Sequence, residues 1–254
     1  MIDVSSKNIV RQSAATGCPG DVVDKALIIA DTLEVMFSYP QCSCFAVNGS
    51  SAKNLLYYNN RLYTGVSLEY AGNDEPNREK IASILYNMLC QNGVRLIKTM
   101  SEDKNTDAFV CGNTRVGVNN IKFSLTIDYG PRTAEPVIRR TVKVLGYEGD
   151  VPVNTFGMDR LNRDILDSLV ARTSPVDVYD LFCCMTENSL KTREEMYGMC
   201  GQCAGRYSAD TLAYAKARLA GLADRDFRYF LEPLLMKGTV FDWHEAVDRI
   251  AALL

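Results

Sequence analysis

The stretch that decides the fold is FAVNGSSAKNLLY, at residues 45–57. It predicts a short apolar strand over 44–47, a tight turn of asparagine, glycine and serine, and a helix over 52–58. A turn of this kind leaves the first N–H groups of the helix without partners inside the helix, and such groups can hold a phosphate. A glycine and a serine before a helix are common, however, so the turn gains weight only from the strand that comes after it.

The next stretch is RLYTGVSLEY, at residues 61–70, and its side chains alternate. Alternation with a period of two predicts a strand with one buried face and one polar face. The polar face includes Gly65, Ser67 and Glu69. A phosphate-binding turn followed by a polar-faced strand is the order of parts in a site for a nucleotide.

The rest of the chain divides into two unlike halves. Helical spacing or capping is present over 20–37, 78–92, 158–172, 175–186, 208–221, 224–236 and 241–254, and strand patterns over 94–98, 108–118 and 121–129. Residues 132–155 are expected to be extended, with no strand signal after them. We therefore predict an α+β fold, with a mixed sheet and flanking helices in residues 1–150 and a helical bundle in residues 151–254.

Composition excludes several classes of protein. The chain has 254 residues, of which 47% are hydrophobic and 23% charged, a profile typical of a globular protein. Its formal net charge of −3 argues against non-specific binding of duplex DNA or an anionic membrane surface. No apolar run approaches the roughly 18 residues that a membrane span needs. We therefore expect a cytoplasmic protein.

The nine cysteines give little evidence of a metal or disulfide site. Cys200 and Cys203 form a C-x-x-C pair, but no second pair follows at zinc-site spacing, and His244 is the single histidine. We expect free, reduced thiols, with a metal or redox pair as the alternative. One histidine, placed in the C-terminal helical region, also makes Ser-His-Asp or Cys-His catalysis improbable.

Taken together, residues 21–185 resemble the AbiEii/AbiGii toxin family, which has a polymerase-β-like nucleotidyltransferase fold. Residues 45–57 resemble the family's Lys-Gly-Gly-Thr-Ala-Leu-Asn-Leu segment, and residues 61–70 resemble its Arg-Leu-Ser-Val-Asp-Ile-Asp-Leu-Asn-Tyr strand. Residues 125–128 are similar to the strand that carries a third acid, and residues 160–181 to a helix pair with an Arg-Asp-x-Tyr-Asp motif. The order of these pieces carries the resemblance.

The resemblance implies Mg²⁺-dependent transfer of a nucleotide from an NTP to a hydroxyl of an RNA end or a protein, with an antitoxin protein as partner. In such a site, metal ions held by carboxylates stabilise the leaving pyrophosphate. The site residues that it implies are Gly49, Ser50, Ser51 and Lys53 for the nucleotide, Glu69 and Asp128 for the metal, and Asp128, Asp177 and Asp180 for catalysis.

The sequence departs from the family pattern at the positions that matter most. Gly65 and Ser67 stand where the family has its two metal-binding aspartates, and neither can bind Mg²⁺ as a carboxylate does. An apolar residue, Ile165, stands near the expected lysine, and Val176 replaces an arginine. Two hypotheses stay open: a nucleotidyltransferase that carries out this Mg²⁺-dependent transfer, with activity either intact or decayed, or an inactive module that binds a nucleotide, an RNA or a partner protein.

Overall fold

The computed structural model describes residues 2–57, 60–99, 104–113, 122–130, 136–143, 145, 150–186 and 205–254. Within these residues a mixed sheet of seven strands has the order β3-β4-β5-β2-β1-β7-β6. The strands are β1 (Phe45–Val47), β2 (Gly65–Tyr70), β3 (Val94–Thr99), β4 (Thr106–Asn113), β5 (Lys122–Asp128), β6 (Ile138–Lys143) and β7 (Asp150–Thr155). The β2–β5 and β1–β7 pairs are parallel, and the other pairs are antiparallel.

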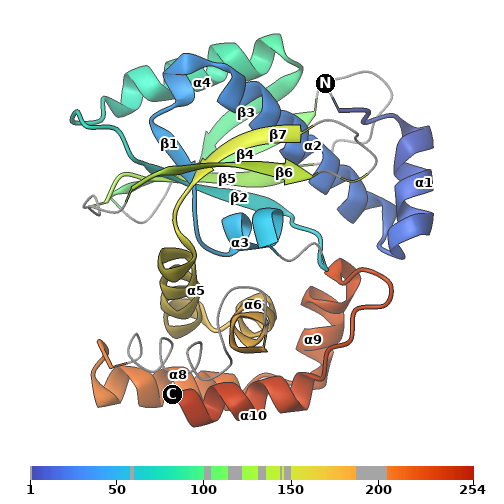
Figure 1. Cartoon of the computed structure of the whole chain (residues 1–254), viewed down its shortest axis with the longest axis vertical. Coiled ribbons are helices and arrows are strands. Elements are labelled where there is room, and N and C mark those ends of the chain that lie inside the picture. The colour runs from blue at the N-terminus through green and yellow to red at the C-terminus, as the bar shows by residue number, and fades with distance from the viewer. Residues whose placement is uncertain are drawn as a thin grey trace.

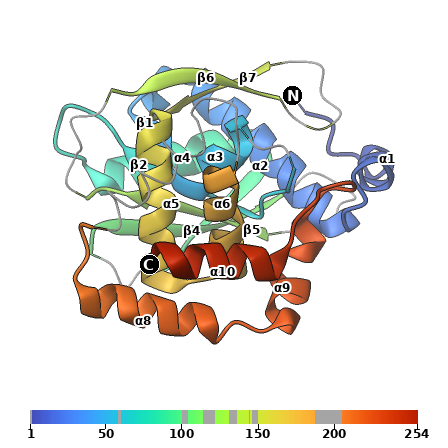
Figure 2. The ribbon, with the colours of Figure 1, turned by 60° about the horizontal axis from the view of Figure 1, so that its bottom comes forward.

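Helices cover both faces of the sheet. The α-helices of the described residues are α1 (Ser6–Thr16), α2 (Gly20–Ser38), α3 (Gly49–Tyr57), α4 (Arg78–Gln91), α5 (Met158–Arg172), α6 (Pro175–Thr186), α8 (Ala209–Ala220), α9 (Asp224–Phe230) and α10 (Trp243–Leu253). Figure 1 shows α2 and α4 on one side of the sheet and α3 on the other, with α5, α6, α8 and α10 grouped beyond α3. Figure 2 shows α8 and α10 lying alongside one another, away from the sheet.

Two large hydrophobic clusters and a small third one, around Tyr179 and Leu231, hold these layers together. The larger one lies between the sheet and α2 and α4, and includes Leu27, Leu68 and Leu125. The second lies among α5, α6, α8 and α10, and includes Ile165 and Ile250. Because apolar burial supplies most of the driving force for folding, separate clusters are the mark of two packed units. These clusters support our proposal that the chain divides into a sheet part and a helical part. The last strand of the sheet, β7, ends at Thr155, so the sheet part extends beyond the predicted boundary at residue 150.

The predicted α+β class and mixed sheet are confirmed. Helices α5 and α6 have the predicted bounds, and β4 and β5 form the predicted antiparallel pair, although residues 119–120 of its turn lie outside the described ranges. Helix α3 starts at Gly49 instead of residue 52, so the glycine and serine of the turn belong to its first turn. None of the described helices has the length and apolar character needed to cross a membrane.

The extended region over 132–155 contributes two strands that the sequence did not predict. Strand β7 inserts next to β1 through a parallel pair, Val47 with Thr155, and β6 pairs with β7 at the edge of the sheet. The side chains of β7 do not alternate between buried and exposed, because Val153, Asn154 and Thr155 are all buried. The alternation that marks a half-buried strand is therefore absent.

Candidate functional site

A cavity of about 630 Å³ lies between the polar face of the sheet, the start of α3, and α5 with the start of α6. Its lining residues are 48–51 at the start of α3, 61 and 63–68 before and along β2, Thr106, Ser124, Thr126 and Asp128 on β4 and β5, and Asp164, Ser168, Arg172, Ser174 and Val176 from α5 and α6. The cavity therefore gathers the turn, the polar strand and the third-acid strand of the sequence analysis in one place.

Hydroxyl groups form the floor of the cavity where the family pattern has carboxylates. In the parallel register of β2 and β5, Gly65 lies opposite Ser124 and Ser67 opposite Thr126, and the Thr126 hydroxyl donates to the Ser67 hydroxyl at 3.2 Å. A Cβ atom placed on Gly65 would lie 2.3 Å from the Ser124 Oγ atom and 3.1 Å from its carbonyl oxygen. Gly65 therefore suits the close approach of Ser124, and an aspartate there would force the Ser124 hydroxyl to rotate away and would crowd its carbonyl oxygen.

Glu69 and Asp128 lie opposite each other one pleat further along the same strands. Because facing residues of paired strands project to the same side, both acids point to the face that carries the cavity. Asp128 lines the cavity, and its Oδ1 atom accepts a hydrogen bond from the Gly130 amide at 2.8 Å. Glu69 is only 7% exposed. The predicted sharing of an ion between these two acids therefore depends on what else Glu69 contacts.

Glu69 is bound by Arg160, from the first turns of α5. One guanidinium nitrogen lies 2.7 Å from the Glu69 carboxylate, and another lies 2.7 Å from Asp164 one turn along the helix. Burial raises the pKa of Glu69 above its usual value, and the charge of Arg160 opposes that rise. Glu69 already has a charged partner, so a cation would have to share the carboxylate with Arg160 or displace it.

The first turn of α3 forms the wall opposite the strand floor. Gly49 has a φ of 54°, a left-handed backbone conformation that glycine adopts most readily. The Ser51 hydroxyl accepts a hydrogen bond from the Ser67 amide at 3.2 Å, which ties the helix to the floor. The Ser50 hydroxyl contacts Asp180 and accepts from Arg61 at 2.9 Å. Gly49, Ser50 and Ser51 thus all face the cavity, as the phosphate-binding prediction requires.

Asp180 forms a buried ion pair with Arg61. Two guanidinium nitrogens donate to its two carboxylate oxygens at 2.8 and 2.6 Å, and the side chains of Arg61 and Asp180 are 4% and 2% exposed. Burial alone would lower the pKa of Arg61, but the charge of Asp180 raises it above its usual value. Asp180 therefore joins α6 to the segment before β2 and is absent from the cavity lining.

Asp177 is held in the same way by Arg172. The guanidinium donates to both carboxylate oxygens at 2.8 and 2.7 Å, and the Ser168 and Ser174 hydroxyls donate at 3.0 and 2.6 Å. Burial raises the pKa of Asp177, yet these hydrogen bonds hold it below the usual range. This network joins the two helices at their turn, and the catalytic role of Asp177 stays a prediction.

Lys53 points away from the cavity. Its side chain is fully buried among α3, α5 and α6, where the Nζ atom contacts Asn162 and the Cys184 sulfur. It is not among the residues that line the cavity. A nucleotide in the cavity would therefore meet the α3 backbone rather than this predicted cation.

The residues present do not fit a two-metal centre. Among the residues that the structure describes, no three acid, histidine or cysteine side chains gather closely enough to hold a metal ion. Two of the three expected positions carry Gly65 and Ser67, and Glu69 and Asp164 are both bound to Arg160. A two-metal centre needs carboxylates that bridge two ions, whereas Asp128 by itself could at most join waters and substrate phosphates around one Mg²⁺. Cys200 and Cys203 lie outside the described residues, so the expectation of reduced, metal-free thiols stays untested.

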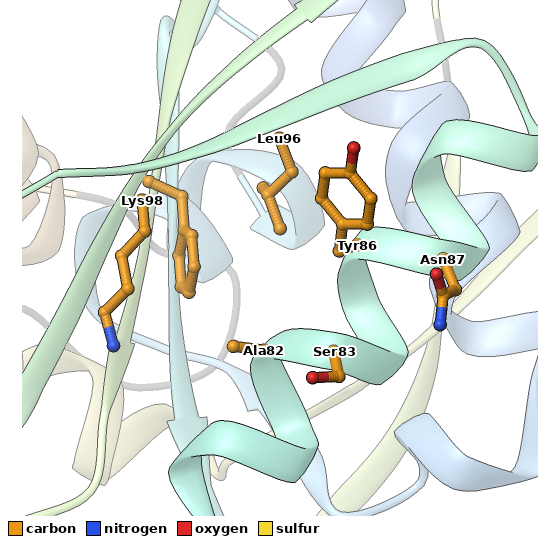
Figure 3. Close-up of a pocket in the computed structure, with 7 residues that line it drawn as sticks. Ala82, Ser83, Tyr86, Asn87, Leu96 and Lys98 are labelled. Atoms are coloured by element: carbon orange, nitrogen blue, oxygen red, sulfur yellow. The ribbon is translucent and has the colours of Figure 1, made fainter.

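A second cavity, of about 340 Å³, lies on the other side of the sheet. Figure 3 shows its two walls, formed by residues 82–87 of α4 and by Leu96 and Lys98 of β3. The ammonium group of Lys98 lies 2.8 Å from the Asp107 carboxylate. This cavity has no acid or helix terminus in its lining and shares no residue with the first one.

Comparison with known proteins shows which fold carries this cavity. The structure is similar to MenT4, a nucleotidyltransferase toxin from Mycobacterium tuberculosis, with a TM-score of 0.62 and 13% identity over 98% of this chain and 89% of that one. The chain therefore shares the fold of proteins described as nucleotidyltransferases. JHP933 from Helicobacter pylori is similar at a TM-score of 0.53 and 14% identity, covering 93% of this chain and 91% of that chain.

A second protein from H. pylori, described as a nucleotidyltransferase, is similar at a TM-score of 0.52 and 15% identity over 98% of this chain and 94% of that one. No protein-family model matches the sequence, and no curated protein matches it significantly. Identities this low show the fold alone, so the chemistry of this chain depends on its own residues.

The sequence did not single out two residues of the site, Arg160 and Asp164. Their spacing of four on a predicted helix indicates a pair on one helix face, which is a common surface feature. Nothing in that spacing shows that the pair meets Glu69, which is 91 positions away.

Proposed function

We propose that this chain is a nucleotide-binding protein in which the nucleotidyltransferase toxin fold has lost metal-dependent transfer. One observation carries the proposal: the cavity has the helix N-terminus that suits a phosphate, but Gly65 and Ser67 at the two metal positions. The α3 amides would hold a phosphate oxygen, since N–H groups at a helix start are unsatisfied and the helix dipole favours an anion. The Ser67 and Thr126 hydroxyls offer hydrogen bonds to a ribose.

Metal-dependent transfer from an NTP to a hydroxyl of an RNA end or a protein is the second candidate. Asp128 favours it, because this acid lines the cavity at the position paired with Glu69. Against it stands the chemistry of the reaction, in which electrostatic stabilisation by metal ions supplies most of the rate. The name of MenT4 also suggests a toxin role, so an antitoxin partner belongs to both candidates, and we propose a cytoplasmic location for both.

Calorimetric titration with each of the four NTPs, with and without Mg²⁺, tests the proposal. We expect binding whose dissociation constant changes by less than about threefold with Mg²⁺, a free energy below about 1 kcal/mol. We expect no transfer of labelled nucleotide to bulk RNA or to the protein itself. Binding that requires Mg²⁺, or transfer that Mg²⁺ supports, would establish the second candidate instead.

The Asp128→Asn variant separates the two candidates further. It removes the one acid that lines the cavity from the described part of the sheet and keeps the size of the side chain. A binding module should bind NTPs as well as before or better, because a negative charge near the phosphates is gone. An enzyme that holds a metal ion through Asp128 should lose both the Mg²⁺ dependence and the transfer.

A further inference from the structure

Asp164 of α5 lies beside the start of α3, where an anion would bind. Its Cβ atom lies 3.9 Å from the position that a Cβ atom on Gly49 would take, and both residues line the cavity. Burial raises the pKa of Asp164, and the charge of Arg160 and the Gly49 amide both lower it. The acid therefore lies within electrostatic reach of the first backbone amide of α3.

The two carboxylate oxygens of Asp164 have different surroundings. Oδ1 accepts a hydrogen bond from Arg160 at 2.7 Å. Oδ2 is buried and has no hydrogen bond of ordinary geometry within the described part of the chain. A buried carboxylate oxygen without a well-formed hydrogen bond is poorly compensated for the water that it has lost, so its negative charge stays poorly screened.

The cations near this end of the cavity are matched or outnumbered by acids, and Arg160 offsets the charge of Asp164 only in part. Of the residues that line the cavity, the described cations are Arg61 and Arg172, and each forms two hydrogen bonds to an acid behind the wall. Arg160 is shared between Glu69 and Asp164. A phosphate that approached α3 would therefore meet a carboxylate without meeting a surplus of positive charge.

We propose that Asp164 is a specificity-determining residue of the cavity, because its carboxylate occupies the anion-binding end of α3 and disfavours a polyphosphate. The proposal rests on the proposed nucleotide-binding function and names its ligand class: nucleosides and nucleoside monophosphates, in preference to triphosphates. A nucleoside can use the hydroxyls of the floor without entering the space that Asp164 fills. A triphosphate brings several negative charges to the same low-dielectric space, where repulsion is strong.

The test is a selectivity measurement on three forms of the full chain. Each of the four nucleosides, monophosphates and triphosphates is titrated without Mg²⁺ into the wild type, Asp164→Asn and Asp159→Asn. The Asp159 variant is the matched control, since it removes the same charge from an exposed position on the same helix. We expect the wild type to bind a monophosphate at least as tightly as its triphosphate, and Asp164→Asn to bind the triphosphate about tenfold tighter or more.

A purely structural role for Asp164, as a cap of α3, would change the unfolding temperature but not the order of ligand affinities. The inference is overturned if Asp164→Asn leaves that order as it is in the wild type, or if Asp159→Asn shifts it equally. Failure of all three forms to bind any of these ligands would overturn the proposed function, and this inference with it. If Asp164→Asn does not fold, as judged by circular dichroism, the same titrations are made with Asp164→Ala, and the same change in the order of ligand affinities is expected.

Discussion

Replacing Asp180 by asparagine should destabilise the protein far more than an ordinary surface substitution. The change keeps the shape of the side chain and its contact with Ser50, but leaves the Arg61 guanidinium without a counter-charge. Because that guanidinium is only 4% exposed, water cannot take the place of the carboxylate. Removing one partner of a buried ion pair costs about 3–5 kcal/mol, and we expect a loss in this range.

The measurement is urea unfolding followed by circular dichroism, with the free energy of unfolding extrapolated to water. The matched control is Asp167→Asn, whose partner Arg206 is half exposed; the two side chains are 47% and 50% exposed. This control should lose less than about 1 kcal/mol, because exposed pairs contribute little.

A double variant tests the physical reason. Arg61→Met together with Asp180→Leu removes both charges, so no buried charge is left unpaired, and the pair of changes should cost less than Asp180→Asn alone. The reasoning is refuted if Asp180→Asn costs no more than the Asp167 control, or if the double variant is less stable than the single one. Either result would mean that water reaches the Arg61 site.

Two further predictions concern the floor of the cavity and the α5–α6 turn. Gly65→Asp with Ser67→Asp should lower the melting temperature measured by calorimetry, since a Cβ atom on Gly65 meets the Ser124 Oγ atom at 2.3 Å. Adding Ser124→Gly should recover stability and raise Mg²⁺ affinity in calorimetric titration; a double variant as stable as the wild type would contradict the close contact. Arg172→Gln should cost about 1–2 kcal/mol at pH 7, because it removes two charge-assisted hydrogen bonds to the buried Asp177 carboxylate. The folded-state pKa of Asp177 lies below its ordinary value of 3.8, so the stability it adds is present above about pH 4 and is lost as the pH falls through that lower pKa. The difference between wild type and Arg172→Gln in urea unfolding should therefore shrink below about pH 4, and a difference that grows there would refute this assignment.

The sequence by itself determined the parts that depend on local spacing. Apolar residues three and four positions apart gave the bounds of α5 and α6, and alternation gave the polar face of β2. The absence of the two metal-binding aspartates is also a sequence fact, since Gly65 and Ser67 can be read without a structure. These features follow from the identity of neighbouring residues, which is all that periodicity reports.

Partner choice was decided only by the tertiary structure. Arg61 and Asp180 are 119 positions apart, and Arg160 and Glu69 are 91 apart, so no local pattern links them. No local pattern predicted the place of β7 either, because this strand lacks a clear alternation and joins the sheet through a parallel pair with the distant β1. A charged side chain can pair with any opposite charge that packing brings near it. For this reason the sequence named the acids of the site, and only the packing of α5 and α6 against α3 and the sheet showed that three of them are already bound to arginines.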